Sequence, residues 1–95
     1  MRRIRIGVVG AGYMGTLHVS KLAELDSSGD SVSLLGLHDI KPERAQLVSQ
    51  RFGVPAYDDI VPLLYDVDAI VVAVPTADHF TVVDQALRSG VDVLV

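Results

Sequence analysis

The stretch that decides the fold is residues 4–15, IRIGVVGAGYMG. Its first half, Ile4–Val9, is mostly apolar and rich in β-branched residues, and glycines follow at once. A buried parallel strand ends in a tight turn in this way. Three of the glycines, Gly10, Gly12 and Gly15, have the spacing GxGxxG. We therefore expect a strand, a tight turn and then a helix.

In this context the glycine spacing predicts a phosphate-binding turn. Gly10 allows the tight turn, Gly12 lets the backbone approach a pyrophosphate without a Cβ in the way, and Gly15 lets the helix pack closely on the sheet. The free N–H groups at Tyr13 and Met14, at the positive end of the helix dipole, would receive the phosphates. The alternative interpretation is a glycine-rich turn that binds no ligand.

Helical patterns recur along the chain. The first helix is expected over Tyr13–Leu25, and the second begins at Pro42 and ends before Gly53. The residues expected to form the buried stripe of the first helix are Met14, Leu17, Leu22 and Leu25. A brief helix follows its expected cap, Asp58.

The last helix is expected to be capped by Thr76 or Asp78 and to end near Gly90. Its inward-facing residues are predicted to be Phe80, Val83 and Leu87.

Further strands are expected between these helices, over Val32–Leu37, Val54–Tyr57, Ala69–Val74 and Val91–Val95. Ala69–Val74 is apolar at every position, as a central strand covered by helices on both faces must be. The order βαβαβαβαβ predicts one α/β domain over residues 1–95, a Rossmann-type doubly wound parallel sheet.

Asp39 comes at the end of the second expected strand, where an acidic residue can accept hydrogen bonds from an adenosine ribose. It lies somewhat further after Gly15 than the usual ~20 positions, and the polar loop 26–31 accounts for the excess. A carboxylate there repels a 2′-phosphate, which favours NAD over NADP. Lys41 and Arg44 are close enough in sequence to weaken that repulsion. The alternative is that Asp39 is only a turn or capping residue.

Pro75, Thr76 and His79 follow the strand expected at 69–74. In a doubly wound sheet this strand and the first one flank the point where the strand order reverses, so their loops face each other across the cofactor cleft. Thr76 and His79 are therefore candidates to touch the nicotinamide ribose or the substrate. The alternatives are that Thr76 is only a helix cap and that His79 is an exposed side chain.

Composition excludes several classes of function. The net charge of −4 leaves no basic stripe for a nucleic acid. With no cysteine there is no disulfide or thiolate site. The longest apolar run is far shorter than the ~20 residues of a membrane helix, so we expect a cytoplasmic protein without a membrane segment. The paired acids Asp58-Asp59 and Asp66 with Asp68 are interpreted as caps and solvated turns, not as a metal site.

Four segments together resemble the N-terminal domain of the Gfo/Idh/MocA oxidoreductases, over essentially all of the chain. They are residues 5–15 with His18, the segment DIKPERA at 39–45, the triplet YDD at 57–59, and the triplet VPT at 74–76 with His79. The resemblance implies an NAD(P)-binding domain whose cofactor contacts include Ile40, Pro75, Thr76 and His79 in addition to the glycine loop and Asp39.

Family membership implies hydride transfer between the nicotinamide and a carbon that bears a hydroxyl group, on a sugar, polyol or similar small molecule. It also implies a C-terminal domain that supplies much of the substrate site and a homo-oligomer interface. In such proteins a Glu-Lys-Pro segment, whose lysine acts on the reacting oxygen, follows the strand at which this chain stops. We therefore expect a partial chain with no catalytic residue, in which His79 is at most an accessory group. The alternative function is a non-catalytic module that senses a dinucleotide or binds a partner.

Overall fold

Four parallel strands form the sheet of the computed structural model, which describes residues 3–94. They are β1 (Ile4–Val9), β2 (Val32–His38), β3 (Ala69–Val72) and β4 (Asp92–Leu94). The strand order is β2-β1-β3-β4. The chain thus builds outward from β1 to β2 on one side and then crosses to β3 and β4 on the other, which confirms the doubly wound parallel sheet.

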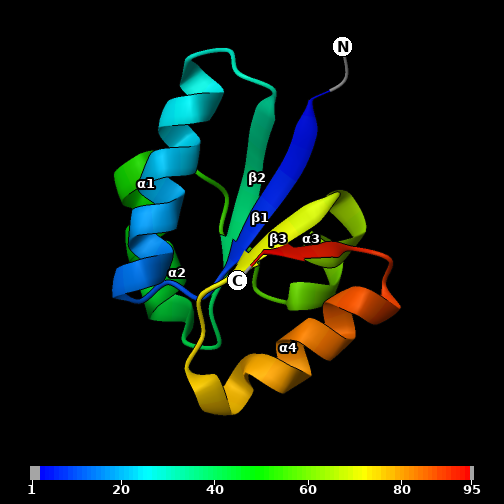
Figure 1. Ribbon diagram of the computed structural model, residues 1–95. Helices are drawn as coiled ribbons and strands as arrows, with labels where there is room; N and C mark the ends of the chain where they lie inside the picture. Colours follow the sequence, from blue (N-terminus) through cyan, green and yellow to red (C-terminus); the bar gives the residue numbers. More distant parts are fainter. Residues whose placement is uncertain (1–2, 95) are drawn as a thin grey trace.

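Helices cover both faces of this sheet (Figure 1). The helices α1 (Tyr13–Ser27) and α2 (Pro42–Phe52) pack on one face, and α3 (Ile60–Asp66) and α4 (Thr76–Arg88) pack on the other. Successive strand residues alternate between the two apolar clusters that result, since Val8 belongs to the first cluster and Val9 to the second. Burial on both faces explains why β3 is apolar at every position.

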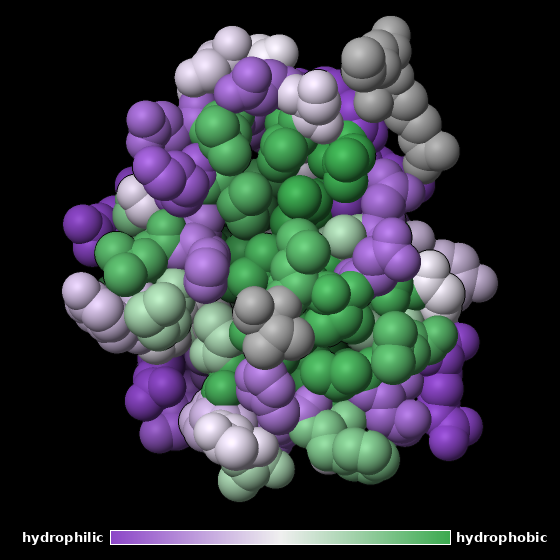
Figure 2. Space-filling model, viewed as in Figure 1, coloured by the Kyte–Doolittle hydropathy of each residue, from purple (hydrophilic) through white to green (hydrophobic). Residues whose placement is uncertain are grey.

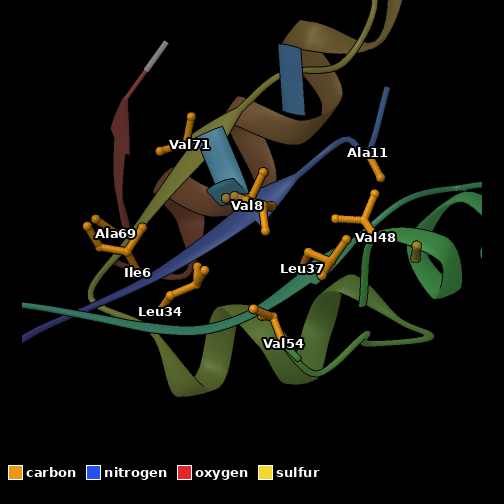
Figure 3. Close-up of a cluster of buried hydrophobic side chains, with 11 residues drawn as sticks. Ile6, Val8, Ala11, Leu34, Leu37, Val48, Val54, Ala69 and Val71 are labelled. Atoms are coloured by element: carbon orange, nitrogen blue, oxygen red, sulfur yellow. The ribbon is translucent and has the colours of Figure 1, made fainter. Parts of the chain in front are cut away.

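The first cluster lies between the sheet and the pair α1 and α2. Figure 3 shows Ile6 and Val8 of β1 together with Leu34 and Leu37 of β2 and Val48 of α2. Val8 and Leu37 are completely inaccessible to solvent. This packing holds the ends of β1 and β2 side by side, and it is at these ends that the glycine turn and Asp39 follow.

The face that α1 buries differs from the expected one. Gly15 and Val19 are buried, whereas Met14 and Leu17 are 54% and 47% exposed. Leu22 is partly buried against the cluster, as expected. Gly15 must face the turn because only a residue without a side chain can approach so closely there, and this requirement sets the rotation of the whole helix.

The expected orientation of α4 is also wrong in part. Phe80 and Leu87 are 80% and 61% exposed, and the buried residue is Ala86. Val83 packs against the second cluster as predicted. The small Ala86 lets the helix approach the sheet, and the bulky residues on its other side then point outward.

The caps of the last two helices differ from the expected ones. Neither Thr76 nor Asp78 caps α4, since the residue at its N-cap is Pro75 and no side chain caps it. The cap of α3 is Asp59 rather than Asp58, and its Oδ1 accepts a hydrogen bond from the N–H of Val61 at 3.0 Å.

The expected strand at 54–57 is reduced to a single parallel bridge between Leu37 and Ala56. Pro55 has no N–H to donate and contributes only its carbonyl oxygen, which accepts from the N–H of Leu37 at 3.0 Å. One pair of hydrogen bonds therefore replaces a ladder. The strand expected at 69–74 ends at Val72, and the last residue of the strand expected at 91–95, Val95, lies outside the described residues.

The strand β4 forms an edge of the sheet, because within residues 3–94 it pairs only with β3. Figure 2 shows apolar residues gathered on the side of the molecule where β1, β3 and β4 are seen in Figure 1. Leu94 of this edge is 51% exposed. An unpaired edge beside apolar surface favours association with another chain. Over the same residues, no helix has the length and apolar character that crossing a bilayer needs.

Polar contacts join Arg3 and Arg5 to neighbouring segments at the side of the sheet far from the glycine turn. Arg5 donates to both carboxylate oxygens of Asp68. Arg3 bonds the Asp26 carboxylate at 2.7 Å, and that carboxylate also accepts from the N–H of Leu34 at 2.9 Å. The expected solvated turn at Asp68 is therefore part of an ion pair, and Asp26 fixes the end of α1 to the start of β2.

Replacing Asp26 by asparagine is expected to lower the free energy of unfolding at pH 7 by about 1 kcal/mol. The N–H of Leu34, together with Arg3, lowers the pKa of Asp26 below its usual value. The carboxylate therefore stabilises the folded state at neutral pH, and this contribution is lost as the pH falls through the acid range. Urea unfolding at pH 7 and at about pH 3 measures it. The difference between wild type and variant should shrink at the lower pH; an equal difference at both pH values would contradict the assignment.

Candidate functional site

A cavity of about 690 Å³ lies outside the carboxyl ends of β1, β2 and β3. Val9 and Gly10 line it from β1, His38 and Asp39 from β2, and Ala73 from the end of β3. Since β1 and β3 flank the point where the strand order reverses, this is where open α/β sheets bind their ligands. The volume is within the range of small-molecule sites.

Gly10 makes the turn above β1 possible. Its φ is +106°, and an added Cβ would lie 2.4 Å from the carbonyl oxygen of Ala73. Its N–H donates to the carbonyl oxygen of His38 at 2.8 Å. Both the backbone conformation and the close approach to the end of β3 require glycine, so Gly10 makes the tight turn as predicted, and it also lines the cavity.

Gly15 does not line the cavity. An added Cβ would lie 1.8 Å from the carbonyl oxygen of Gly10 and 3.7 Å from the Cβ of Ala73. The first turn of α1 therefore packs directly on the glycine turn and close to the end of β3. This agrees with the expected packing role of Gly15, and its predicted contact with the cofactor stays a prediction.

Gly12 differs from the other two glycines because no contact within residues 3–94 excludes a side chain there. Its φ is −77°, and the nearest atom to an added Cβ is Nη1 of Arg44, at 3.8 Å. The space above Gly12 belongs to the cavity, which Tyr13 and Met14 also line. No side chain caps α1, and its first turn contains no acidic residue. The first N–H groups of a helix have no acceptor inside it, so the end of α1 suits an anionic ligand.

Asp39 is buried, with 7% of its surface exposed, and its carboxylate bonds the backbone on two sides. One oxygen accepts from the N–H of Ala11 at 2.6 Å, and the other accepts from the N–H of Lys41 at 2.7 Å. The carboxylate thus ties the glycine turn to the segment after β2. Each oxygen has a further lone pair, and Asp39 lines the cavity. The carboxylate can therefore still accept the hydrogen bonds predicted from a ribose.

Two cations face the same cavity near Asp39. Lys41 and Arg44 both line it, and neither forms an ion pair with a described residue. Arg44 Nη1 is the atom nearest to the Gly12 position. These side chains place two positive charges near Gly12, where they can pair with phosphate oxygens.

The residues predicted after β3 are only partly brought to the cavity. Pro75 lines it, together with Asp78 and Thr81 of α4, whereas Thr76 and His79 are not among the lining residues. Ile40 lines it and is 84% exposed. Among residues 3–94 no group of three His, Asp or Glu side chains is arranged to hold a metal ion.

Sequence reasoning missed several cavity residues. They are Val9, His38, Ile60, Ala73, Val74, Asp78, Thr81, Val82 and Gln85. Those on α4 face the cavity because of the rotation of that helix, which no local pattern signals. His38 could have been found from its position directly before Asp39 at the end of a strand.

Comparisons with known proteins agree with this geometry. The family model named Gfo/Idh/MocA, described as an oxidoreductase family with an NAD-binding Rossmann fold, matches residues 4–95. The chain is 34% identical over 95 residues to UDP-N-acetylglucosamine 3-dehydrogenase of Acidithiobacillus ferrooxidans. The match covers 100% of this chain and 28% of that protein.

Two solved structures are similar to the whole chain. The structure of GenD2 from gentamicin A biosynthesis, in complex with NAD, has a TM-score of 0.85 and 31% identity, and covers 100% of this chain and 27% of that one. The structure of myo-inositol dehydrogenase from Lactobacillus casei, in complex with NAD(H) and myo-inositol, has a TM-score of 0.83 and 26% identity. The match covers 96% of this chain and 27% of that one. The chain thus spans little more than a quarter of the length of these relatives.

Proposed function

Because the chain belongs to the Gfo/Idh/MocA family of oxidoreductases with an NAD-binding Rossmann fold, we propose that it binds the NAD(H) of a dehydrogenase acting on a sugar, a polyol or a similar small molecule. The observation that carries the proposal is the open space above Gly12, at the uncapped end of α1 and inside the cavity that Asp39 lines. Among the described residues only Arg44 comes within 4 Å of a Cβ added there, and a pyrophosphate in this fold needs that space.

The bound dinucleotide would lie across the carboxyl end of the sheet. Its pyrophosphate would rest on Gly12 and on the N–H groups of Tyr13 and Met14, with Arg44 as counter-charge. The adenosine ribose would bond Asp39. The nicotinamide half would extend toward Pro75, and contacts from Thr76 and His79 stay predictions.

The cofactor supplies the chemistry of hydride transfer, and the described residues of this chain hold and orient it. The proton transfer at the substrate oxygen is assigned to residues of a second domain, in line with the small share of each relative that this chain spans. The substrate class is supported by the relatives named above, which are dehydrogenases of a nucleotide sugar and of a polyol. These names favour the enzyme over the regulatory module. The homo-oligomer and the cytoplasmic location stay predictions.

Calorimetric titration of the purified protein with NADH tests the cofactor part of the proposal. We expect saturable binding below about 1 mM. A longer protein that contains this chain should then oxidise members of a polyol and sugar panel with NAD. Absence of NADH binding by both proteins would contradict the proposed function, and binding without turnover by the longer protein would favour a sensing role.

Replacing Asp39 by alanine is expected to shift the preference from NAD toward NADP by about tenfold, or about 1.4 kcal/mol. The change removes a ribose acceptor and a charge that repels a 2′-phosphate, and leaves Lys41 and Arg44 in place. The measured quantity is the ratio of the NADH and NADPH dissociation constants. Because Asp39 also bonds the N–H groups of Ala11 and Lys41, both affinities are expected to fall.

The control for the structural role is Asp39→Asn, which keeps one acceptor oxygen and loses the charge. It should show the same shift in the ratio with a smaller loss of thermal stability than the alanine variant. A ratio that stays constant in both variants would show that Asp39 only shapes the glycine turn.

A further inference from the structure

A histidine at the end of β2 is among the polar residues of the cavity. His38 is the last residue of β2, directly before Asp39, and it lines the cavity. Its Nδ1 lies 2.9 Å from the backbone carbonyl oxygen of Tyr57. A carbonyl oxygen only accepts hydrogen bonds, so Nδ1 carries the proton and donates it. In the neutral ring the other nitrogen, Nε2, is then an acceptor.

The carbonyl group that fixes this tautomer is itself held firmly. The N–H of Tyr57 donates to the carbonyl oxygen of Leu37 at 2.7 Å, and its hydroxyl donates to Asp66 Oδ2 at 2.7 Å. The ring lies so close to Gly36 that an added Cβ there would be 2.4 Å from the ring atom Cε1. Tyr57 is therefore anchored at its backbone, its ring and its hydroxyl, and the acceptor that faces His38 does not move away.

Nε2 of His38 is left for a ligand. Within residues 3–94 the structure contains no protein hydrogen bond to this atom, and no buried side-chain nitrogen or oxygen there lacks a partner. Nε2 is therefore accessible rather than enclosed in the core. Because His38 lines the cavity, the imidazole presents a fixed acceptor to whatever occupies the space beside it.

The surroundings of His38 suit a purine base. In this fold the adenosine ribose binds the acidic residue that follows the second strand. The base attached to this ribose would therefore lie next to His38 and Ile40. Ile40, Ile60 and Val82 supply apolar walls of the same cavity. Thr81 and Gln85 also line it, but a hydroxyl or an amide can both donate and accept. Such groups do not distinguish an amino group from a carbonyl group on the base, whereas a fixed acceptor does.

We propose that Nε2 of His38 accepts a hydrogen bond from the exocyclic amino group of adenine, and that His38 thereby selects adenine over a 6-oxopurine such as hypoxanthine. The proposal rests on the proposed binding of NAD(H) and adds the residue that reads the base. Hypoxanthine carries a carbonyl oxygen where adenine carries the amino group, so two acceptors would face each other.

The test compares NADH with reduced nicotinamide hypoxanthine dinucleotide on wild type and two variants. In His38→Asn the amide nitrogen can replace Nδ1 as donor to Tyr57, but no atom occupies the position of Nε2. In His38→Gln the amide group reaches that position, but it can present either its oxygen or its nitrogen to the base. We expect wild type to bind NADH about tenfold more tightly than the hypoxanthine analogue. The preference should fall to about twofold or less in both variants, and the glutamine variant should bind each dinucleotide more tightly than the asparagine variant does.

The outcomes separate this proposal from the proposed function. NADH binding with an unchanged tenfold preference in His38→Asn would overturn the role of His38 alone. Failure of wild type to bind either dinucleotide would overturn the proposed function and the role of His38 with it. Thermal unfolding of both variants establishes that they are folded.

A measurement on wild type needs no substitution at position 38. Nitrogen NMR of protein labelled at histidine, with signals assigned through His18→Gln and His79→Gln, should show the His38 tautomer that carries its proton on Nδ1. NADH should shift the Nε2 signal more than the hypoxanthine analogue does. A His38 ring protonated on Nε2, or equal shifts with both dinucleotides, would overturn the proposal.

Discussion

Replacement of Gly12 by valine is expected to abolish measurable NADH binding and to leave the domain folded. The φ of −77° at Gly12 is open to any L-residue, and the nearest atom to the added Cβ is the flexible end of Arg44, 3.8 Å away. The protein thus has room for the new side chain. The pyrophosphate does not, because it must approach the backbone at this position. We expect the dissociation constant of NADH to rise by about 100-fold or more, a loss of about 2.7 kcal/mol.

Calorimetric titration of Gly12→Val with NADH measures this loss, and thermal unfolding of the same sample shows whether the fold is kept. The control is Gln50→Val, which places a valine on the exposed side of α2, outside the residues that line the cavity. It should bind NADH as wild type does. A folded Gly12→Val variant with wild-type affinity would contradict the assignment of the pyrophosphate to the glycine turn.

Replacement of Gly15 by alanine, unlike replacement of Gly12 by valine, is expected to cause a large loss of stability. The added Cβ would lie 1.8 Å from the carbonyl oxygen of Gly10 and 2.6 Å from its carbon. Both are backbone atoms, so no rotamer change relieves the overlap, and the first turn of α1 must move away from the glycine turn. In an unobstructed helix the same change gains about 1 kcal/mol. Here we expect the free energy of unfolding to fall by about 3 kcal/mol or more.

Denaturant unfolding of Gly15→Ala measures this loss, with Gly12→Ala as the matched control. The control adds the same methyl group three residues earlier, where it meets no atom closer than 3.8 Å. Its stability should stay within about 0.5 kcal/mol of wild type. A Gly15→Ala variant as stable as wild type would show that the turn and the helix are not packed as the structure has them.

The parts of the fold that depend on local backbone chemistry were predictable from the sequence. The strand before Gly10 and the helix after Gly12 are where the glycine spacing puts them. The helix α2 begins at Pro42 and ends before Gly53, whose φ of +67° terminates it. In each case one residue with special backbone properties fixes the boundary, so neighbouring sequence is enough to find it.

The parts that depend on distant contacts were not predictable. The rotation of α1 follows from the contact of Gly15 with Gly10, and the outward position of Phe80 follows from the close packing of Ala86 on the sheet. Apolar spacing alone suggested different buried faces for both helices. The segment at 54–57 has strand-like composition, but Pro55 leaves it with a single bridge to β2.

In the candidate site, too, some features were predictable from the sequence and others were not. Gly10, Gly12 and Asp39 could be selected from their places at the ends of strands, because the fold brings those ends together. The double role of Asp39, which bonds the N–H of Ala11 as well as lining the cavity, depends on the relative placement of two loops. The position of His38 beside the Tyr57 carbonyl likewise depends on a contact between segments 19 residues apart.

The central claim is that the cavity over the glycine turn binds NAD(H), and amide NMR of the ¹⁵N-labelled protein during an NADH titration tests it most directly. We expect the largest shift changes at the amides of Gly10, Gly12, Met14, Asp39 and Ile40. Amides at the opposite end of the strands, such as those of Arg5 and Asp68, should change little. Shift changes centred away from the glycine turn, or none at about millimolar NADH, would contradict the claim.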